Sequence, residues 1–401
     1  MSDRAINLCL FSNQPVRGGV EEHMLLLLGG LDRKYFRLHL ICSPQLAGNL
    51  RSDLPEDVHL VPLYLEHLHH VSAGLRFAKI LRKCRIDILH SHLFRASLVA
   101  SPLAKFCRVP VTVETPHVAE MWRQGWLRGH FLIDRVAGRA VNRYIAVSEA
   151  NARYLVDTKR LPSQKIQVIQ NGCNLERFRT VQPSPVDLKR NLGFADDDPV
   201  LLVLARLEAQ KGHHVLVEAM SAVRAQFPNA RLVCVGSGSL QSQLKEQVEK
   251  LGLEESVRFV GYQSNVPDWL ALADVVVLPS FFEGLPLVAI EALAAGRAVV
   301  ATAVDGTTEV VIHEKTGFTV PPGNSAALAA AICRMLGNAK LRQTLAENGR
   351  RWAFENFTLQ RFIDQTQQLY LATWEQHLRK FQPRRNPAVS STAPAASPRS
   401  S

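Results

Sequence analysis

The chain has 401 residues, a length that suits two domains of about 150–200 residues each better than one compact core. Hydrophobic residues make up 47% of it and charged residues 21%, with 23 glycines and 21 prolines, which excludes a collagen, a coiled coil or a largely disordered chain. The net charge is +11 and uneven, since residues 1–185 hold 25 Lys and Arg against 15 Asp and Glu, while residues 186–375 hold 17 against 21.

The first residues predict a β-strand and not a targeting segment. Asp3 and Arg4 lead directly into the apolar run 6–11. The longest uncharged apolar run near the N-terminus, residues 24–31, has eight residues, far fewer than the roughly 20 that span a bilayer. Seven scattered cysteines without a CxxC pair are typical of a reducing compartment. We therefore expect a cytoplasmic protein.

Short apolar runs alternate with longer amphipathic stretches, which predicts repeated βα units and parallel sheets. In the first half the expected strands are 5–11, 37–43, 58–63, 86–91, 111–114, 144–147 and 166–169, with helices over 72–84 and 131–141. In the second half the expected strands are 200–204, 232–235, 257–260, 275–278 and 299–301. The pattern predicts an α/β protein of two doubly wound domains with a cleft between them.

Composition suggests where these domains end. Two prolines within residues 181–185 predict a linker, which places an N-terminal domain over 1–185 and a C-terminal domain over 186–358. Residues 359–381 predict one long helix. Residues 382–401 are rich in Pro, Ser, Ala and Arg without periodicity, which predicts a disordered tail.

Glycines follow two of the predicted strands. Gly236 and Gly238 lack the third glycine of a dinucleotide-binding fingerprint, which argues against such a cofactor. Gly18 and Gly19 precede an apolar helix expected to begin near Val20. Glycines there let a ligand approach the backbone, and helix-start amides favour an anion. A flexible loop before a helix would account for the same pair.

A basic pair follows the strand expected at 200–204. Arg206 stands at the end of this strand, and Lys211 lies in the loop after it. Ligands of open α/β sheets bind outside such strand ends, and an Arg with a Lys can neutralise a diphosphate. Taken alone, such a pair is more often ordinary surface charge.

Two glutamates follow the strand expected at 275–278. Glu283 lies in a loop, and Glu291 lies in a helix expected over 287–295, whose first turn Pro286 suits. The free amides of this helix should point into the cleft. Because carboxylates beside phosphate-binding groups would repel phosphates, we expect these two to bind hydroxyls of a sugar and a ribose.

These residues resemble a known family. Glu283 and Glu291, preceded by Pro279-Ser280 and followed by Ala294-Ala295-Gly296, look like the signature of the retaining glycosyltransferases of family 4, with the GT-B fold. Matching motifs elsewhere are Gly18-Gly19-Val20-Glu21, Thr115-Pro116-His117, Val147-Ser148-Glu149, Asn171-Gly172, Ala205-Arg206-Leu207 with Lys211-Gly212, Val235-Gly236-Ser237-Gly238, Phe259-Val260-Gly261-Tyr262, and Thr316-Gly317-Phe318 with Pro322-Gly323-Asn324. The resemblance covers about residues 5–375, although Cys173-Asn174 departs from the usual hydrophobic-then-Asp ending.

The resemblance implies two Rossmann-like domains facing a central cleft, with the C-terminal helix crossing back to the N-terminal domain. The C-terminal domain would hold a nucleotide-diphosphate sugar, a UDP- or GDP-sugar, and the N-terminal domain the acceptor. By position, Arg206 and Lys211 would hold the diphosphate and Glu291 the ribose. The remaining implied donor contacts are Glu283 with the amides of Gly284 and Leu285 for the sugar, Val260 and Tyr262 for the base, and Gly18 and Gly19 for the phosphates.

The implied catalytic residues are His117, near the anomeric carbon, and Glu283. A strand-end histidine satisfied by its neighbours is the alternative for His117. The acceptor-side candidates are Glu21, Ser148 and Glu149. With Glu283 occupied by sugar hydroxyls, same-face substitution, in which the leaving phosphate helps remove the acceptor proton, is the more economical route to retention.

No metal and no cofactor besides the donor is expected. His67-x-His69-His70 lacks a ligand set at metal spacing, and His90 with His92 makes only two ligands. Arg206, Lys211 and the helix end would supply the positive charge instead. Two rival functions share the donor site: a GT-B epimerase or nucleotide-sugar hydrolase, and a non-catalytic donor-binding module.

The basic N-terminal half predicts docking on an anionic membrane, at its inner face, and a glycan or lipid-linked acceptor. Arg76, Lys79 and Lys83 share one face of the helix expected at 72–84. A second stripe consists of Arg128, Arg135 and Arg139, near Trp122 and Trp126. An ordinary solvated helix face explains either stripe equally well. Nothing offers a reading helix or a stacking sheet, so we expect no nucleic-acid partner.

Overall fold

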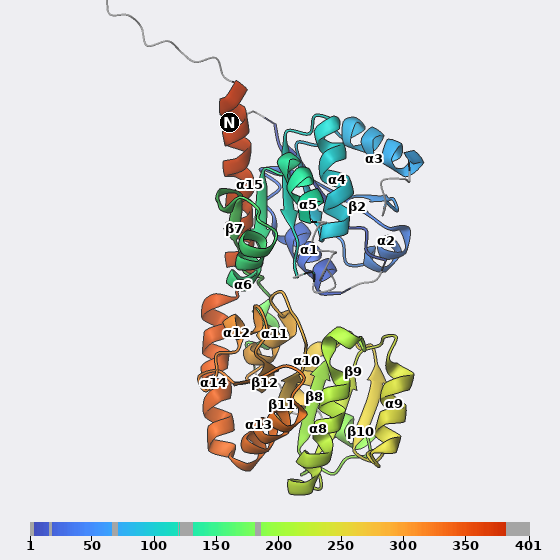
Figure 1. The fold of residues 1–401 in the computed structure, drawn as a ribbon, viewed down its shortest axis with the longest axis vertical. Coiled ribbons are helices and arrows are strands. Elements are labelled where there is room, and N and C mark those ends of the chain that lie inside the picture. Colours follow the sequence, from blue (N-terminus) through green and yellow to red (C-terminus); the bar gives the residue numbers. More distant parts are fainter. Residues whose placement is uncertain are drawn as a thin grey trace, which may run out of the picture.

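The computed structural model contains two parallel β-sheets, each covered by helices (Figure 1). It describes residues 4–15, 18–65, 71–118, 120, 131–180 and 186–381. The predicted linker at 181–185, the predicted tail, His67-x-His69-His70, and Trp122, Trp126 and Arg128 lie outside these residues. The predicted α/β fold of two doubly wound sheets is confirmed.

The N-terminal sheet has the strand order β3-β2-β1-β4-β5-β6-β7. Its strands are β1 (Ile6–Phe11), β2 (Phe36–Cys42), β3 (His59–Pro62), β4 (Ile88–His92), β5 (Val111–Thr115), β6 (Arg143–Ala146) and β7 (Ile166–Val168). All neighbouring strands are parallel. The direction of winding changes between β1 and β4, which makes this the switch point of the sheet.

Helices cover both faces of this sheet. They are α1 (Gly19–Gly30), α2 (Pro44–Leu50), α3 (Val71–Lys83), α4 (Phe94–Phe106), α5 (Phe131–Ala137) and α6 (Glu149–Arg153). Leu8 and Leu10 of β1 pack with α1 and α2, whereas Cys9 and Phe11 pack with α3 and α4. The division follows from the strand, because successive side chains point to opposite faces.

The helix expected over 131–141 is wrong beyond Ala137. Gly138–Ala140 continues as a short 3-10 turn. Gly138 packs so closely on the next strand that an added Cβ would lie 2.5 Å from the hydroxyl of Tyr144. Glycine is a poor residue for a helix interior, which agrees with the α-helix ending there.

The C-terminal sheet has the order β10-β9-β8-β11-β12-β13, again parallel, with its switch point between β8 and β11. Its strands are β8 (Val200–Leu204), β9 (Arg231–Val235), β10 (Val257–Gly261), β11 (Val275–Leu278), β12 (Ala298–Thr302) and β13 (Phe318–Val320). Every predicted strand is present, with ends within two residues of the predicted ones. Among the strands of the described residues, the short edge strand β13 is the one that was not predicted.

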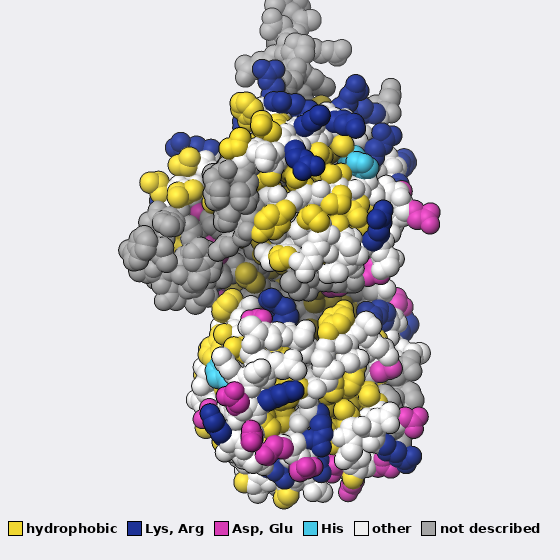
Figure 2. Space-filling model, turned by 90° about the vertical axis from the view of Figure 1, so that its right-hand side faces the viewer, with side chains coloured by type: hydrophobic (Ala, Val, Ile, Leu, Met, Phe, Trp, Pro, Cys, Tyr) yellow, Lys and Arg dark blue, Asp and Glu magenta, His cyan; other side chains and the backbone are white. Residues whose placement is uncertain are grey.

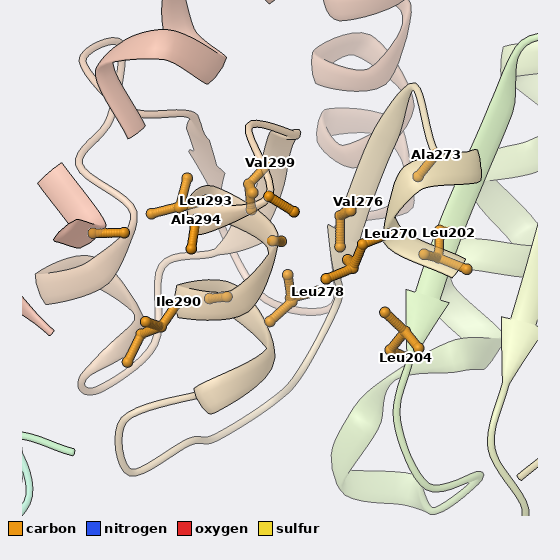
Figure 3. Close-up of a cluster of buried hydrophobic side chains, with 14 of the residues drawn as sticks. Leu202, Leu204, Leu270, Ala273, Val276, Leu278, Ile290, Leu293, Ala294 and Val299 are labelled. Carbon is orange, nitrogen blue, oxygen red and sulfur yellow. The ribbon is translucent and has the colours of Figure 1, made fainter. Parts of the chain in front are cut away.

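Two layers of helices enclose this second sheet. They are α7 (Val186–Asn191), α8 (His213–Gln226), α9 (Gln241–Lys250), α10 (Val266–Leu272), α11 (Leu287–Ala294), α12 (Thr307–Val310), α13 (Ser325–Gly337) and α14 (Ala339–Asn356). Figure 3 shows one layer, where Leu202 and Leu204 of β8 and Ile290 of α11 belong to one buried apolar cluster. This packing holds α11 against the sheet.

The last helix, α15 (Leu359–Phe381), connects the two halves. It leaves the C-terminal half and runs along the N-terminal one (Figure 1). Phe362, Ile363 and Tyr370 belong to the same buried cluster as Leu8 and Leu10. The predicted crossing of this helix is therefore confirmed. Within the described chain, no helix combines the length and the apolar character that a membrane crossing requires.

Candidate functional site

A cavity of about 470 Å³ lies between the two sheets. Loops after β1, β4 and β5 line it from the N-terminal half, and loops after β8 and β11 line it from the C-terminal half. Both switch points therefore open onto one cavity, at the strand ends where α/β sheets bind ligands. Its size suits a small organic ligand.

The structure brings most of the predicted site residues together. The following line the cavity: Gly18, Gly19, Glu21, His117, Arg206, Lys211, Glu283, Gly284 and Leu285. The cavity lining within the described chain does not include Ser148, Glu149, Val260, Tyr262 or Glu291.

Glu21 lies in the first turn of α1 and is only 3% exposed. The hydroxyl of Ser12 donates to its Oε1 at 3.4 Å. Burial raises the pKa of Glu21 to about 7, although the amides of Glu21 and Gly18, the Ser12 hydroxyl and the charge of Arg206 oppose the shift. Near neutral pH this carboxyl is therefore partly protonated, which weakens its repulsion of an anion in the cavity.

His117 follows β5 with a left-handed backbone, φ 64°. Its side chain is buried, and its Nε2 lies 3.0 Å from Nδ1 of His92. Burial, with the neighbouring His23 and His90, lowers the pKa of His117 well below its ordinary value. The ring is therefore neutral at physiological pH and can offer hydrogen bonds but no charge.

Sequence reasoning missed His23, which α1 brings against His117 with ring centres 4.7 Å apart. Nδ1 of His23 lies 2.9 Å from Oδ1 of Asn171. One ring nitrogen each of His23, His92 and His117 lies within 4.8 Å of the other two. Nδ1 of His92 and Nε2 of His117 lie at hydrogen-bond distance, and which of the two nitrogens donates depends on the tautomers of the two rings.

Lys211 and Glu283 form an ion pair across the C-terminal wall, with Nζ 2.5 Å from Oε1. The hydroxyl of Ser280 donates to the same carboxylate oxygen at 2.7 Å. Arg206, at the end of β8, is exposed. From the sequence we expected Lys211 to bind the diphosphate and Glu283 to bind the sugar. In the structure the two side chains pair with each other.

The loop that carries Glu283 touches the N-terminal half. A Cβ on Gly284 would lie 1.8 Å from the carbonyl oxygen of His117, so only glycine leaves room for this contact. The amide of Glu283 donates to Oδ2 of Asp305 at 3.1 Å. α11 begins at Leu287 after Pro286, as predicted, and both residues line the cavity.

Glu291 and the two residues predicted for the base lie away from the cavity wall. Glu291 is partly buried. It follows Leu287 by four residues and therefore lies on the same face of α11. Burial raises the pKa of Glu291 to about 7, and the charge of Arg177 opposes the shift. Val260 and Tyr262 lie at the end of the edge strand β10, where Tyr262 is 66% exposed.

Ser148 and Glu149 lie at the contact between the two halves. Ser148 is buried, and its hydroxyl accepts a hydrogen bond from the amide of Asn151, which caps α6. The amides of Glu149 and Ala150 donate to the carboxylate of Glu309 in α12, at 3.1 and 3.0 Å. The described contacts of both residues are thus structural.

Comparison with known proteins gives two family matches. Residues 187–352 match the family model described as glycosyl transferases group 1, and residues 17–177 match glycosyltransferase family 4. Glycogen synthase of Mycobacterium tuberculosis is 32% identical over 75% of this chain and 73% of its own. An Escherichia coli UDP-Gal:alpha-D-GlcNAc-diphosphoundecaprenol alpha-1,3-galactosyltransferase is 25% identical over 89% of this chain and 94% of its own.

The solved structures agree on the fold. Alr3699/HepE of Anabaena, crystallised with UDP and glucose, superposes with a TM-score of 0.79 at 22% identity. The superposition covers 92% of this chain and 100% of that one. At this identity the likeness supports the shared arrangement of two sheets.

Proposed function

The chain belongs to family 4 of the glycosyltransferases and has their GT-B fold, and from this premise we propose that it is a retaining enzyme that transfers a sugar from a nucleotide-diphosphate sugar to a glycan or lipid-linked acceptor. A UDP-sugar is the donor to test first, because the Anabaena structure contains UDP and the E. coli relative is named for UDP-Gal. The same relative is named for a diphosphoundecaprenol acceptor, which supports a lipid-linked acceptor here.

One observation carries the proposal: a single cavity joins two cations and a helix start on one wall to His117 and Glu21 on the other. Arg206 and Lys211 suit a diphosphate, since guanidinium and ammonium groups form strong hydrogen bonds with phosphate oxygens. The first turn of α11 adds free amides and the positive end of its dipole.

In the proposed reaction the bond between the anomeric carbon and the diphosphate oxygen breaks, and negative charge grows on the diphosphate. Arg206, Lys211 and the start of α11 stabilise that charge more than they stabilise the bound donor, which lowers the barrier. A phosphate that binds Lys211 replaces Glu283 as its partner. The carboxylate of Glu283 then becomes available to accept hydrogen bonds from the sugar hydroxyls.

The acceptor oxygen bonds to the anomeric carbon on the face that the diphosphate leaves, and its proton passes to the departing phosphate. His117 lies in the cavity wall as a neutral imidazole, so it can orient a hydroxyl without repelling the positive charge that develops on the sugar. Glu21 lies on the same side of the cavity and is a candidate to bind the acceptor.

We propose that transfer requires no metal ion, because the two cations and the helix start supply the positive charge. The assay follows transfer from labelled UDP-sugars, with and without a lipid extract, after dialysis against EDTA. Undiminished transfer is the expected result. A loss of transfer that Mg²⁺ or Mn²⁺ restores would overturn the metal-free proposal, and one that Zn²⁺ alone restores would point to His23, His92 and His117.

The same assay separates the rival functions. Label transferred to a lipid or glycan supports a glycosyltransferase acting on that acceptor. Free sugar or an epimerised donor, produced equally without an acceptor, would overturn the proposed transfer. Nuclear magnetic resonance of the product decides between retention and inversion, because the coupling constant of the anomeric proton differs between the two configurations.

A further inference from the structure

We propose that the outer face of α3, α4 and α5 docks on an anionic lipid bilayer. This docking face is defined here by the exposed residues of α3, α4 and α5 and the turn that follows α5. It lies in the N-terminal half, outside the cavity. The inference deepens the proposed function by naming the surface on which the enzyme would meet a membrane-bound acceptor.

The docking face combines positive charge with an almost complete lack of negative charge. Its exposed cations are Arg76, Lys79, Arg82, Lys83, Lys105, Arg135 and Arg139. The three helices contain one acidic residue, Asp134, and it is buried beside Lys159 at 3.1 Å. Figure 2 shows dark blue side chains gathered over the N-terminal half, while blue and magenta mix over the C-terminal half.

Large apolar side chains are exposed on the same helices. Of the ten exposed large hydrophobic residues in the described chain, six lie there: Val71, Leu75, Phe106, Leu132, Ile133 and Val136. Phe106 is 75% exposed and Leu75 is 68% exposed. The guanidinium of Arg82 lies over the ring of Phe106, 5.9 Å from its centre. Side chains with an apolar body and a charged or polar tip suit a membrane interface, where one part is buried and the other stays in water.

The inner sides of α3 and α4 account for the rest of their apolar residues. Phe77, Leu81, Val99 and Ala100 are buried in one cluster against the sheet. Leu75 and Phe106 are therefore not part of the core. Solvated helix faces normally carry both charge signs and few large apolar groups, and this face departs from that in both respects.

An anionic bilayer matches both features at once. Its headgroups attract Lys and Arg, and its acyl boundary accepts Leu and Phe side chains. Nucleic acid would satisfy the cations alone and would leave the aliphatic side chains of α5 in water. We therefore assign the docking face to lipid.

The test is sedimentation of the full chain with phosphatidylcholine vesicles that contain or lack phosphatidylglycerol, in the absence of donor. Binding should require phosphatidylglycerol and weaken as salt rises. The variant Arg76→Glu/Lys79→Glu/Lys83→Glu should bind at least about a hundredfold more weakly, since each cation near the surface contributes about fivefold. A second variant, Leu75→Ser/Phe106→Ser, should also bind more weakly, and both should keep the circular dichroism spectrum of the parent.

The matched control changes net charge equally but elsewhere. Lys245, Lys250 and Lys340 are exposed in the C-terminal half, and Lys245→Glu/Lys250→Glu/Lys340→Glu should bind vesicles like the parent. Equal loss in both triple variants would overturn the docking face in favour of net charge. Binding to duplex DNA as tight as to vesicles, and indifferent to Leu75→Ser/Phe106→Ser, would overturn lipid in favour of a general polyanion.

Activity keeps this proposal distinguishable from the proposed function. Efficient transfer to a soluble acceptor by a protein that ignores anionic vesicles would overturn the docking face and leave the enzyme assignment intact. Vesicle binding that requires phosphatidylglycerol, without any sugar transfer, would support the docking face and overturn the proposed transfer.

Discussion

Lys211 and Glu283 are two site residues whose partners would change if a diphosphate bound as proposed. Each neutralises the other, with Nζ of Lys211 2.5 Å from Oε1 of Glu283. A diphosphate offers Lys211 a stronger partner than one carboxylate oxygen, because it presents more negative charge and more acceptors. Under the proposed function, a donor diphosphate would therefore replace Glu283 as the partner of Lys211.

Removal of either cation should weaken both donor binding and turnover. We expect Arg206→Ala and Lys211→Ala each to cost about 1.5–3 kcal/mol of interaction with the diphosphate, the range for hydrogen bonds to charged groups. Calorimetry with UDP and steady-state kinetics measure the two effects. Arg334→Ala, which removes an exposed pair with Glu314 and a contact with the ring of Phe318, both outside the cavity lining, is the control and should change neither. Wild-type kinetics in both site variants would place the diphosphate elsewhere.

Glu291→Gln should separate stability from binding. Burial raises the pKa of Glu291 from 4.5 to about 7, so between these values the folded protein holds a proton that the unfolded chain has released. The free energy of unfolding therefore falls as pH rises through this window. Because Gln cannot ionise, Glu291→Gln should melt at a higher temperature than the parent at about pH 8, with a smaller difference at about pH 5.

The same variant should bind UDP more weakly, because an amide is a weaker acceptor for ribose hydroxyls than a carboxylate. Calorimetry at about pH 8, where Glu291 of the parent is ionised, measures this. A higher melting temperature of Glu291→Gln together with unchanged UDP binding would show that Glu291 is not part of the donor site. Its raised pKa would still be supported.

At the scale of elements, the site depends on where loops from different sheets meet. The loop after β5 carries His117, and the loop between β11 and α11 carries Glu283 and Gly284. The two loops touch where Gly284 faces the carbonyl of His117. Buried apolar packing holds α11 on its sheet (Figure 3), so the loop before it has little freedom to retreat.

Gly284→Ala should therefore displace one of these two loops and lower activity. The new methyl group would overlap the carbonyl of His117, and relieving the clash must move one loop. We expect kcat/KM to fall by about a hundredfold, the typical effect of an ångström-scale displacement. The control Gly29→Ala adds a methyl group in open space within α1, and it should raise the free energy of unfolding by about 0.4–1 kcal/mol without affecting kcat/KM. Equal activity in the two variants would contradict the tight contact.

At the scale of the whole molecule, the two halves are joined by α15 and by polar contacts around the cavity. Glu309 of the C-terminal half accepts from the amides of Glu149 and Ala150 and from Nε2 of Gln170, all at 3.0–3.1 Å. Asn171 donates from Nδ2 to the carbonyl of Leu285 at 3.2 Å. These bonds hold the two walls of the cavity together.

Glu309→Ala should loosen this arrangement. It removes a carboxylate from three donors, and we expect the contact between the halves to weaken by about 1–2 kcal/mol after screening by water. Small-angle scattering should show a larger radius of gyration, and the KM for the donor should rise. Glu314→Ala, which affects only an exposed pair within the C-terminal half, is the control. An unchanged scattering curve with an unchanged KM would mean that the Glu309 contacts do not help to set the orientation of the two halves.

The sequence by itself determined the described strands except β13, the parallel sheets, the long last helix and nine of the residues that line the cavity. Five further predicted site residues lie outside that lining: Ser148, Glu149, Val260, Tyr262 and Glu291. Apolar periodicity and strand-end motifs are local, so they can be read without knowing the fold. Only the tertiary structure decided that His23 packs against His117, that Lys211 pairs with Glu283, and that Glu309 reaches Glu149. These contacts join residues from separate βα units, and their geometry depends on how whole sheets and loops pack, which no local pattern encodes.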